Sequence, residues 1–282
     1  MKKLFISLLT LLISSSQYAL AQMISETEKV EIKGSYTNPI PSPDGNFVLL
    51  SGDQLNGIAL LNMKTKSITP ISDADGSGYG YTWSNDSQTI YFKVKPENAY
   101  VMDSEVFSYN IKTRKRSKVD INHNYLPSYN GENNIVVYTN IRTLKIEAID
   151  LRTKKSWVVT NNDGQFYSAT LSHDGKKVAV HEGSSVYVYN IDGSGVIAKL
   201  GMGIATSWSM DDKYLVGYLS ESPDGHVVTN SDLYLFNVET SRAEKLTNTK
   251  DNLEAEPSFM GKDKIIYVDE KNGQILISNI KI

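Results

Sequence analysis

Cysteine is absent from the 282-residue chain, which excludes disulfide bonds and a lipid-modified cysteine, so stability has to come from packing. The net charge is only −3, from 29 basic and 32 acidic residues. This balance creates no global field and gives no reason to expect nucleic acid or an anionic membrane as a partner. No long apolar segment occurs after the N-terminal one, so no membrane span is expected in the mature chain.

The N-terminus has the features of a secretory signal peptide. Lys2 and Lys3 form a basic start, residues 4–13 are an apolar run, and Ala19-Leu20-Ala21 is a small-x-small cleavage site. The run is too short to span a bilayer comfortably, so an uncleaved anchor is disfavoured. We predict a signal peptide at residues 1–21, a single mature domain at residues 22–282, and export to the periplasm or the extracellular medium.

The mature chain is organised by a turn that repeats, first seen as Ser42-Pro43-Asp44-Gly45. The Asp carboxylate can accept a hydrogen bond from the backbone N–H two residues later, and Gly tolerates a positive φ. These two properties explain why Asp and Gly occur in this turn. The copies start at positions 42, 84, 129, 172, 209 and 259, which are 42, 45, 43, 37 and 50 residues apart. A period near 40–45 residues with short strands between turns is the signature of a β-propeller with one blade per repeat.

A second turn, with the sequence Asn/Asp-x-x-Thr or a degenerate form of it, occurs once in each repeat. Its copies start at Asn62, Asn110, Asp150, Asn190, Asn237 and Asn279. Short β-branched and aromatic runs lie between the two turns and read as the middle strands of each blade. We therefore predict an all-β fold, a six-bladed β-propeller of four-stranded antiparallel blades, with strands named A to D in chain order.

The last repeat ends at Ile282 without residues for its strand D. Near the other end of the chain, residues 28–33 alternate polar and apolar side chains before the first repeat begins. We predict that this N-terminal strand completes the last blade and closes the ring, which removes free sheet edges.

The Ser-Pro-Asp-Gly turn, the aromatic-Ser pairs Trp83-Ser84 and Trp208-Ser209, and the Asn/Asp-x-x-Thr turns together resemble the TolB-like six-bladed propellers, whose unit is called the WD40-like β-propeller repeat. The resemblance covers residues 22–282. It implies the propeller fold, whereas its motifs are turns and say little about function. TolB has an extra N-terminal α/β domain, for which this chain has no length.

Function in a propeller is usually carried by loops. The D–A and B–C connections are expected to share one face, around the mouth of the central channel. Their aromatic side chains are the candidate ligand-binding residues, because aromatics are enriched at binding cores, although each ring has the alternative of packing between blades. The candidates are Tyr36, Tyr79, Tyr81, Tyr125, Phe166 and Tyr167. The long B–C connections of the second and fifth blades, 94–104 and 219–231, are further candidates, with surface insertion as the alternative.

Three histidines, His123, His181 and His226, also map to loops of this face, and three imidazoles can hold a divalent transition metal. The oligogalacturonate lyases, which are also propellers, look like a precedent for such a site. Exposed lone histidines are the alternative. His173 lies in an A–B turn on the opposite face. Paired carboxylates such as Glu254 and Glu256 are a further candidate for acid–base chemistry on a glycan.

The sequence thus favours an exported, non-enzymatic, monomeric propeller without a cofactor. It would bind a protein, a peptide or a glycan partner of the cell envelope at its channel mouth. A metal-dependent carbohydrate lyase or hydrolase, and a purely structural module of an envelope assembly, are the alternatives.

Overall fold

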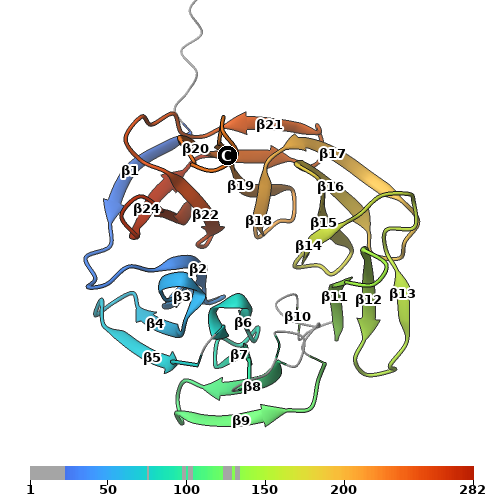
Figure 1. The fold of residues 1–282 in the computed structure, drawn as a ribbon, viewed down its shortest axis with the longest axis horizontal. Coiled ribbons are helices and arrows are strands. Elements are labelled where there is room, and N and C mark those ends of the chain that lie inside the picture. The colour runs from blue at the N-terminus through green and yellow to red at the C-terminus, as the bar shows by residue number, and fades with distance from the viewer. Residues whose placement is uncertain (1–22, 75, 97–99, 101–103, 123–128, 131–133) are drawn as a thin grey trace, which may run out of the picture.

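Six four-stranded antiparallel sheets form a ring in the computed structural model, which describes residues 23–74, 76–96, 100, 104–122, 129–130 and 134–282 (Figure 1). Each sheet is one blade, and its strands A to D run from the channel outward. The number of blades and the positions of the middle strands agree with the sequence prediction. Among the described residues, no helix is long and apolar enough to cross a membrane.

The strand boundaries follow the repeat. Blade 1 contains β2 (Thr37–Pro41), β3 (Phe47–Ser51), β4 (Ile58–Asn62) and β5 (Ile68–Ser72), and blade 2 contains β6 (Tyr81–Trp83), β7 (Thr89–Val94), β8 (Glu105–Asn110) and β9 (Lys115–Val119). Blade 3 contains β10 (Tyr129–Asn130), β11 (Ile135–Asn140), β12 (Lys145–Asp150) and β13 (Ser156–Val158), and blade 4 contains β14 (Tyr167–Leu171), β15 (Lys177–Glu182), β16 (Ser185–Asn190) and β17 (Val196–Met202). Blade 5 contains β18 (Ile204–Trp208), β19 (Tyr214–Glu221), β20 (Asn230–Asn237) and β21 (Arg242–Lys245), and blade 6 contains β22 (Glu254–Phe259), β23 (Lys264–Asp269), β24 (Gln274–Ile280) and β1 (Ile24–Lys29). Two 3-10 turns, η1 (Asp53–Leu55) and η2 (Ser77–Tyr79), lie in the connections of blades 1 and 2.

The ring is closed by β1, which pairs antiparallel with β24 as strand D of blade 6. The predicted closure is confirmed, but its position was wrong, because the strand is Ile24–Lys29 and not residues 28–33. Ile24 is buried opposite Ile280, and the Val30 N–H still donates to the Ile275 carbonyl at 2.9 Å. Beyond Val30 the chain leaves β24 and crosses to blade 1, so the alternation seen in residues 28–33 continues past the end of the pairing.

The repeated A–B turn is held by its own Ser and Asp. In the first copy, the Ser42 hydroxyl donates to Asp44 Oδ1 at 2.6 Å and accepts the Phe47 N–H at 3.0 Å. The turns that begin at Ser84, Ser172 and Ser209 repeat both bonds. The hydroxyl contributes to lowering the pKa of Asp44. The sequence signature is therefore explained by turn geometry.

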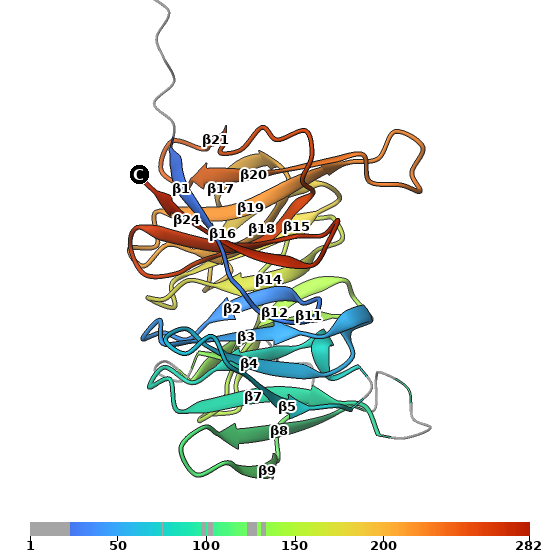
Figure 2. The same ribbon diagram turned by 90° about the vertical axis from the view of Figure 1, so that its left-hand side faces the viewer.

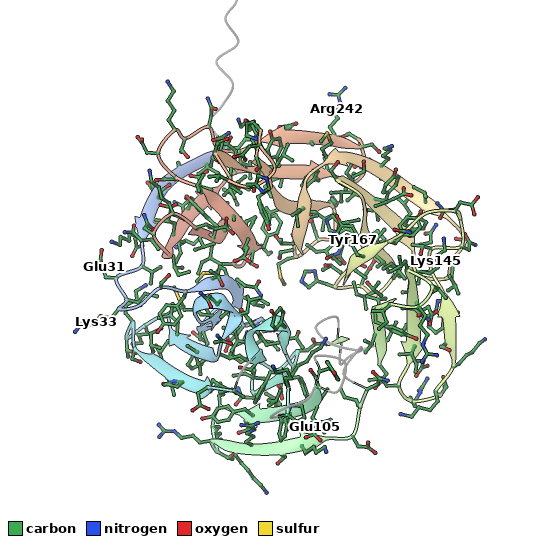
Figure 3. All side chains as sticks on the ribbon, in the orientation of Figure 1. Glu31, Lys33, Glu105, Lys145, Tyr167 and Arg242 are labelled. Carbon is green, nitrogen blue, oxygen red and sulfur yellow. The ribbon has the colours of Figure 1, made fainter. Side chains whose placement is uncertain are left out.

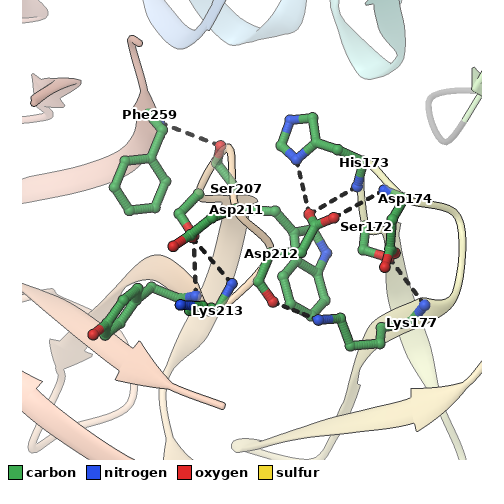
Figure 4. Close-up of polar contacts among 12 residues, drawn as sticks. Ser172, His173, Asp174, Lys177, Ser207, Asp211, Asp212, Lys213 and Phe259 are labelled. Carbon is green, nitrogen blue, oxygen red and sulfur yellow. Dashed lines mark hydrogen bonds and ion pairs between the residues drawn. The ribbon is translucent and has the colours of Figure 1, made fainter. Parts of the chain in front are cut away.

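Neighbouring blades are joined through the fourth residue of this turn. Asp212 has a left-handed backbone (φ 56°), and its buried carboxylate accepts the N–H groups of His173 and Asp174 in blade 4, both at 2.8 Å (Figure 4). Its Oδ1 also lies 2.9 Å from His173 Nδ1. Ser87 occupies the same position in blade 2 and accepts the Asp44 N–H of blade 1 at 3.0 Å.

The tryptophan that precedes Ser84 and the one that precedes Ser209 provide another link between blades. The indole N–H of Trp83 donates to the Ile40 carbonyl, and that of Trp208 donates to the Thr170 carbonyl, each at 3.0 Å. Both bonds reach strand A of the preceding blade, and both rings are buried. The rings thus fix the angle between adjacent sheets around the channel.

Removing residues 22–33 should destabilise the whole ring. The deletion exposes the edge of β24 and removes the buried side chains of Ile24 and Val30, worth about 1.5–3 kcal/mol each. Urea unfolding should show a lower midpoint than in a chain that starts at Gln22, and a synthetic 22–33 peptide should restore part of the loss. An unchanged midpoint would contradict the closure.

Substituting Asp212 should weaken the contact between blades 4 and 5. In Asp212→Ala, two backbone N–H groups lose their acceptor, so the free energy of unfolding should fall by about 2–3 kcal/mol. Asp212→Asn keeps an acceptor oxygen and should lose less. The matched control is Asp263→Ala, an exposed carboxylate beside the blade 6 turn, and equal effects of both alanine variants would rule out the bridging role.

Candidate functional site

One face of the ring carries the D–A and B–C connections, and we call it the mouth face. Its described residues are 30–36, 52–57, 73–74, 76–80, 95–96, 100, 104, 120–122, 141–144, 159–166, 183–184, 203, 222–229, 246–253 and 270–273. The two kinds of connection contact each other, as where the Phe166 N–H donates to the Leu144 carbonyl at 2.8 Å. The opposite face carries the A–B and C–D turns, where the Met63 N–H donates to the Asn46 carbonyl at 3.0 Å.

The B–C hairpin of blade 5 projects from the mouth face (Figure 2). Residues 219–221 of β19 and 230–232 of β20 continue the sheet beyond the end of β18. Part of the long connection predicted from the sequence is therefore a strand extension, and residues 222–229 form the loop at its end. At its tip, Asp224 accepts the N–H groups of His226 and Val227, both at 2.9 Å. The second long connection belongs to blade 2, which lies opposite blade 5 in the ring of six blades.

Two of the predicted binding aromatics are exposed on the mouth face. The side chain of Tyr79 is 59% exposed and that of Tyr167 is 42% exposed. Tyr167 lies on the inner side of the ring (Figure 3) and stacks on His181 with ring centroids 5.5 Å apart. Tyr36 is half-buried and packs against the core between blades 1 and 6. Tyr125 lies outside the described residues.

Tyr81 and Phe166 are core residues, each only 1% exposed, so the expectation that they present their rings at the mouth was wrong. The Tyr81 hydroxyl donates to the Asn38 carbonyl of the preceding blade at 2.6 Å. Phe166 packs edge-on against Tyr189, with centroids 5.8 Å apart. Tyr81 is the first residue of strand A in blade 2, where it contacts blade 1. Phe166 lies just before strand A of blade 4, where Tyr189 of the same blade packs on it.

The histidines that the structure describes do not gather into a metal site. His181 is fully buried in β15, where Nε2 accepts the Ala205 N–H at 2.9 Å and Nδ1 donates to the Ser168 carbonyl at 3.3 Å. Burial lowers the pKa of His181, so it is held neutral as a link between blades 4 and 5. His226 is exposed at the hairpin tip, and His123 lies outside the described residues. Within the described part of the chain, no group of three His, Cys, Asp or Glu side chains has metal-binding geometry.

Tyr79 and Tyr167 belong to an apolar rim on and beside the mouth face, and sequence reasoning missed its other members. Its members are exposed by 40% to 80%, and most have no aromatic or motif signal that marks them: Tyr79, Tyr100, Ile141, Tyr167, Met202, Ile204 and Val227. Most of the exposed large apolar side chains in the described residues belong to this apolar rim. These side chains can be placed at the mouth face only once the ends of the strands are known.

Carboxylates lie near the channel at the junction of blades 6 and 1. Glu256 has a left-handed backbone (φ 52°), and its Oε2 accepts the Asn38 N–H at 2.5 Å. Burial, and then the negative charge of Glu270, raise the pKa of Glu256. Burial first, and then both carboxylates, raise the pKa of the Tyr218 phenol. Glu254, the partner suggested by the sequence, is buried, and burial raises its pKa as well.

The channel contains a cavity of about 310 Å³ that reaches the A–B turn face, and we call it the channel cavity. It is lined by strands A and A–B turns of five blades: Asn38, Ile40, Pro41, Ser42, Pro43, Tyr81, Thr82, Trp83, Ala169, Thr170, Leu171, Ser172, His173, Thr206, Ser207, Trp208, Met210, Ser258, Phe259 and Gly261. No Asp, Glu, Lys or Arg is among these residues. Sequence reasoning missed this cavity, because apart from Trp83 and Trp208 its lining in strands A carries no repeated motif.

Together the ring and its two ends define a β-propeller with six blades and a channel open to ligands. The sequence matches no protein-family model and no curated protein. Among solved structures, the chain is similar to TolB from Acinetobacter baumannii (TM-score 0.63, 18% identity), with 83% of this chain covered and 59% of that one. It thus spans less than two thirds of that TolB.

Other propellers are similar to the same degree. The Cps50 (Swd1) β-propeller domain of Myceliophteria thermophila has a TM-score of 0.64 at 11% identity, covering 92% of this chain and 99% of that chain. Oligogalacturonate lyase from Vibrio parahaemolyticus has a TM-score of 0.56 at 12% identity, covering 89% and 80%. At these identities the similarity defines the fold alone, a six-bladed propeller like that of TolB.

The raised pKa of Glu256 predicts a pH-dependent effect of Glu256→Gln. The folded state binds this proton at a higher pH than the unfolded chain, so the ionised carboxylate costs stability above the raised pKa, and the cost disappears as pH falls toward the ordinary value of 4.5. The variant should therefore be more stable than wild type at neutral pH, and the difference should shrink toward pH 4.5.

Urea unfolding at a series of pH values measures this difference. The control is Glu239→Gln, an exposed carboxylate on the C–D turn of blade 5. A difference that stays constant with pH, or a variant less stable than wild type at neutral pH, would contradict the assignment.

Proposed function

We propose that this protein is an exported, non-enzymatic propeller that binds a protein or peptide partner of the cell envelope through its mouth face. The apolar rim is the observation that carries this proposal. Exposed apolar side chains of this size are costly to leave in water, and their concentration around one opening is typical of a contact surface.

The architecture supports an extended contact. Tyr79, Tyr167 and Ile204 lie at or beside the starts of strands A, close to the channel, whereas Val227 is at the tip of the projecting hairpin. A partner that lies across the mouth would contact the inner aromatic rings and the hairpin together. Rigid strands position these side chains, so little ordering entropy opposes binding.

The polar groups of the mouth face favour a partner with a basic character. Glu270 belongs to the mouth face, and Glu256 lies beside it in β22. Burial raises the pKa of both carboxyls first, and the negative charges of Glu270 on Glu256 and of Asp269 on Glu270 add to it. A lysine or arginine of the partner would lower the repulsion between them. The signal peptide predicted at residues 1–21, which lie outside the described residues, supports an encounter in the periplasm or outside the cell.

Site-specific photo-crosslinking tests the mouth face. A photoreactive phenylalanine in place of Tyr79 or Tyr167 should give one common adduct in cells that produce the partner. The same residue in place of Val196, which is 49% exposed on the outer strand β17, should not give it. Tyr79→Ala combined with Ile204→Ala should weaken binding of the captured partner by about tenfold or more, whereas Val196→Ala should not.

Adducts at position 196 alone, or equal binding by the double variant and Val196→Ala, would refute the proposal. All variants are compared at an unchanged melting temperature, so that loss of binding is separated from loss of folding.

A further inference from the structure

We propose that the channel cavity binds a neutral, hydroxyl-rich small molecule, of the class of a mono- or disaccharide, at the end of the channel opposite to the mouth face. Its volume of about 310 Å³ suits one or two sugar rings and falls at the lower end of the roughly 300–1,000 Å³ of small-molecule pockets. The site is separate from the apolar rim, so this inference does not depend on the proposed function.

Polar side chains without a protein partner converge on the channel cavity. The hydroxyls of Thr82, Thr170 and Ser258 line it, and none of the three makes a side-chain hydrogen bond to another described residue. They come from blades 2, 4 and 6, so they lie on different sides of the cavity. Each offers both a donor and an acceptor, which is the pattern that a polyol matches.

Three other hydroxyls of the lining already form hydrogen bonds within the protein. The Thr206 hydroxyl donates to the Val216 carbonyl at 3.3 Å, and Ser207 Oγ accepts the Phe259 N–H at 3.2 Å. The Ser172 hydroxyl is used within its turn. The hydroxyls of Thr82, Thr170 and Ser258 are therefore not required by the fold as these three are.

The charge of the lining selects against ions. Because no Asp, Glu, Lys or Arg is among the described residues that line the channel cavity, a charged ligand would lose hydration without gaining a counter-charge from them. His173 lines the turn end, where its Nδ1 lies 2.9 Å from the buried Asp212 carboxylate, which fixes the ring orientation. The negative charge of Asp212 is already shared among the backbone N–H groups of His173 and Asp174.

Apolar walls complete the site. Trp83, Trp208 and Phe259 contribute ring surface, and both indole N–H groups are already used by backbone carbonyls. These rings therefore offer only their carbon atoms, which pack against the C–H faces of a sugar. Met210, 53% exposed, and the half-exposed His173 mark the open end through which a ligand enters.

Tryptophan emission reports on this site, because two of the three tryptophans of the chain line it. We would titrate the full chain with D-glucose, N-acetyl-D-glucosamine and maltose, following emission and the heat of binding. At least one should give saturable binding, and glucuronate and glucosamine, which carry a charge, should bind more weakly than their neutral counterparts.

The variants Thr170→Val and Ser258→Ala remove a hydroxyl at nearly constant volume and should each weaken binding by about tenfold. Thr69→Val, on the outer strand β5, is the matched control and should bind like wild type. Melting temperatures show that each variant is folded.

Three results would overturn the proposal. They are no saturable response to any of the three neutral sugars, binding of the charged analogues as tight as that of the neutral ones, and affinities of Thr170→Val and Ser258→Ala equal to that of Thr69→Val.

Discussion

The pairing of β1 with β24 is the interaction on which the rest of the structure depends. It joins residues more than 240 positions apart and turns six sheets in a row into a ring, with Ile24 opposite Ile280. Without it, β24 would expose an unpaired edge, and blades 6 and 1 would lose their common core around Val30 and Val48. Both ends of the channel exist only because the ring closes, since each is built from nearly all the blades.

Closure divides the molecule into two chemically different ends. The mouth face combines exposed apolar side chains with carboxylates of raised pKa, and its hairpins reach beyond the ring. The opposite end carries tight turns, in which Ser, Asp and backbone groups satisfy each other, around an uncharged cavity. Because strand A runs from one end to the other in every blade, a single repeat supplies residues to both.

Turns were the predictable part of this fold. The Ser42–Asp44 bond is local, and it has the same partners in other copies, so a short sequence pattern is enough to reveal it. Burial was less predictable, because it depends on the neighbouring blade. Tyr79 lies in the connection before β6 and Tyr81 starts β6 two residues later, yet Tyr81 is in the core and Tyr79 is exposed. Period and composition contain no information on that difference.

Chain order adds a constraint on how the molecule is made. The strand β1 precedes the other strands of the ring in the chain and its partner β24 follows them, so β1 has no place to pair until the last blade has been synthesised. Blades 1 to 5 consist of consecutive segments and can form in turn as the chain emerges. The ring then closes by a long-range docking of β1 on β24, which requires every blade between them to be in place.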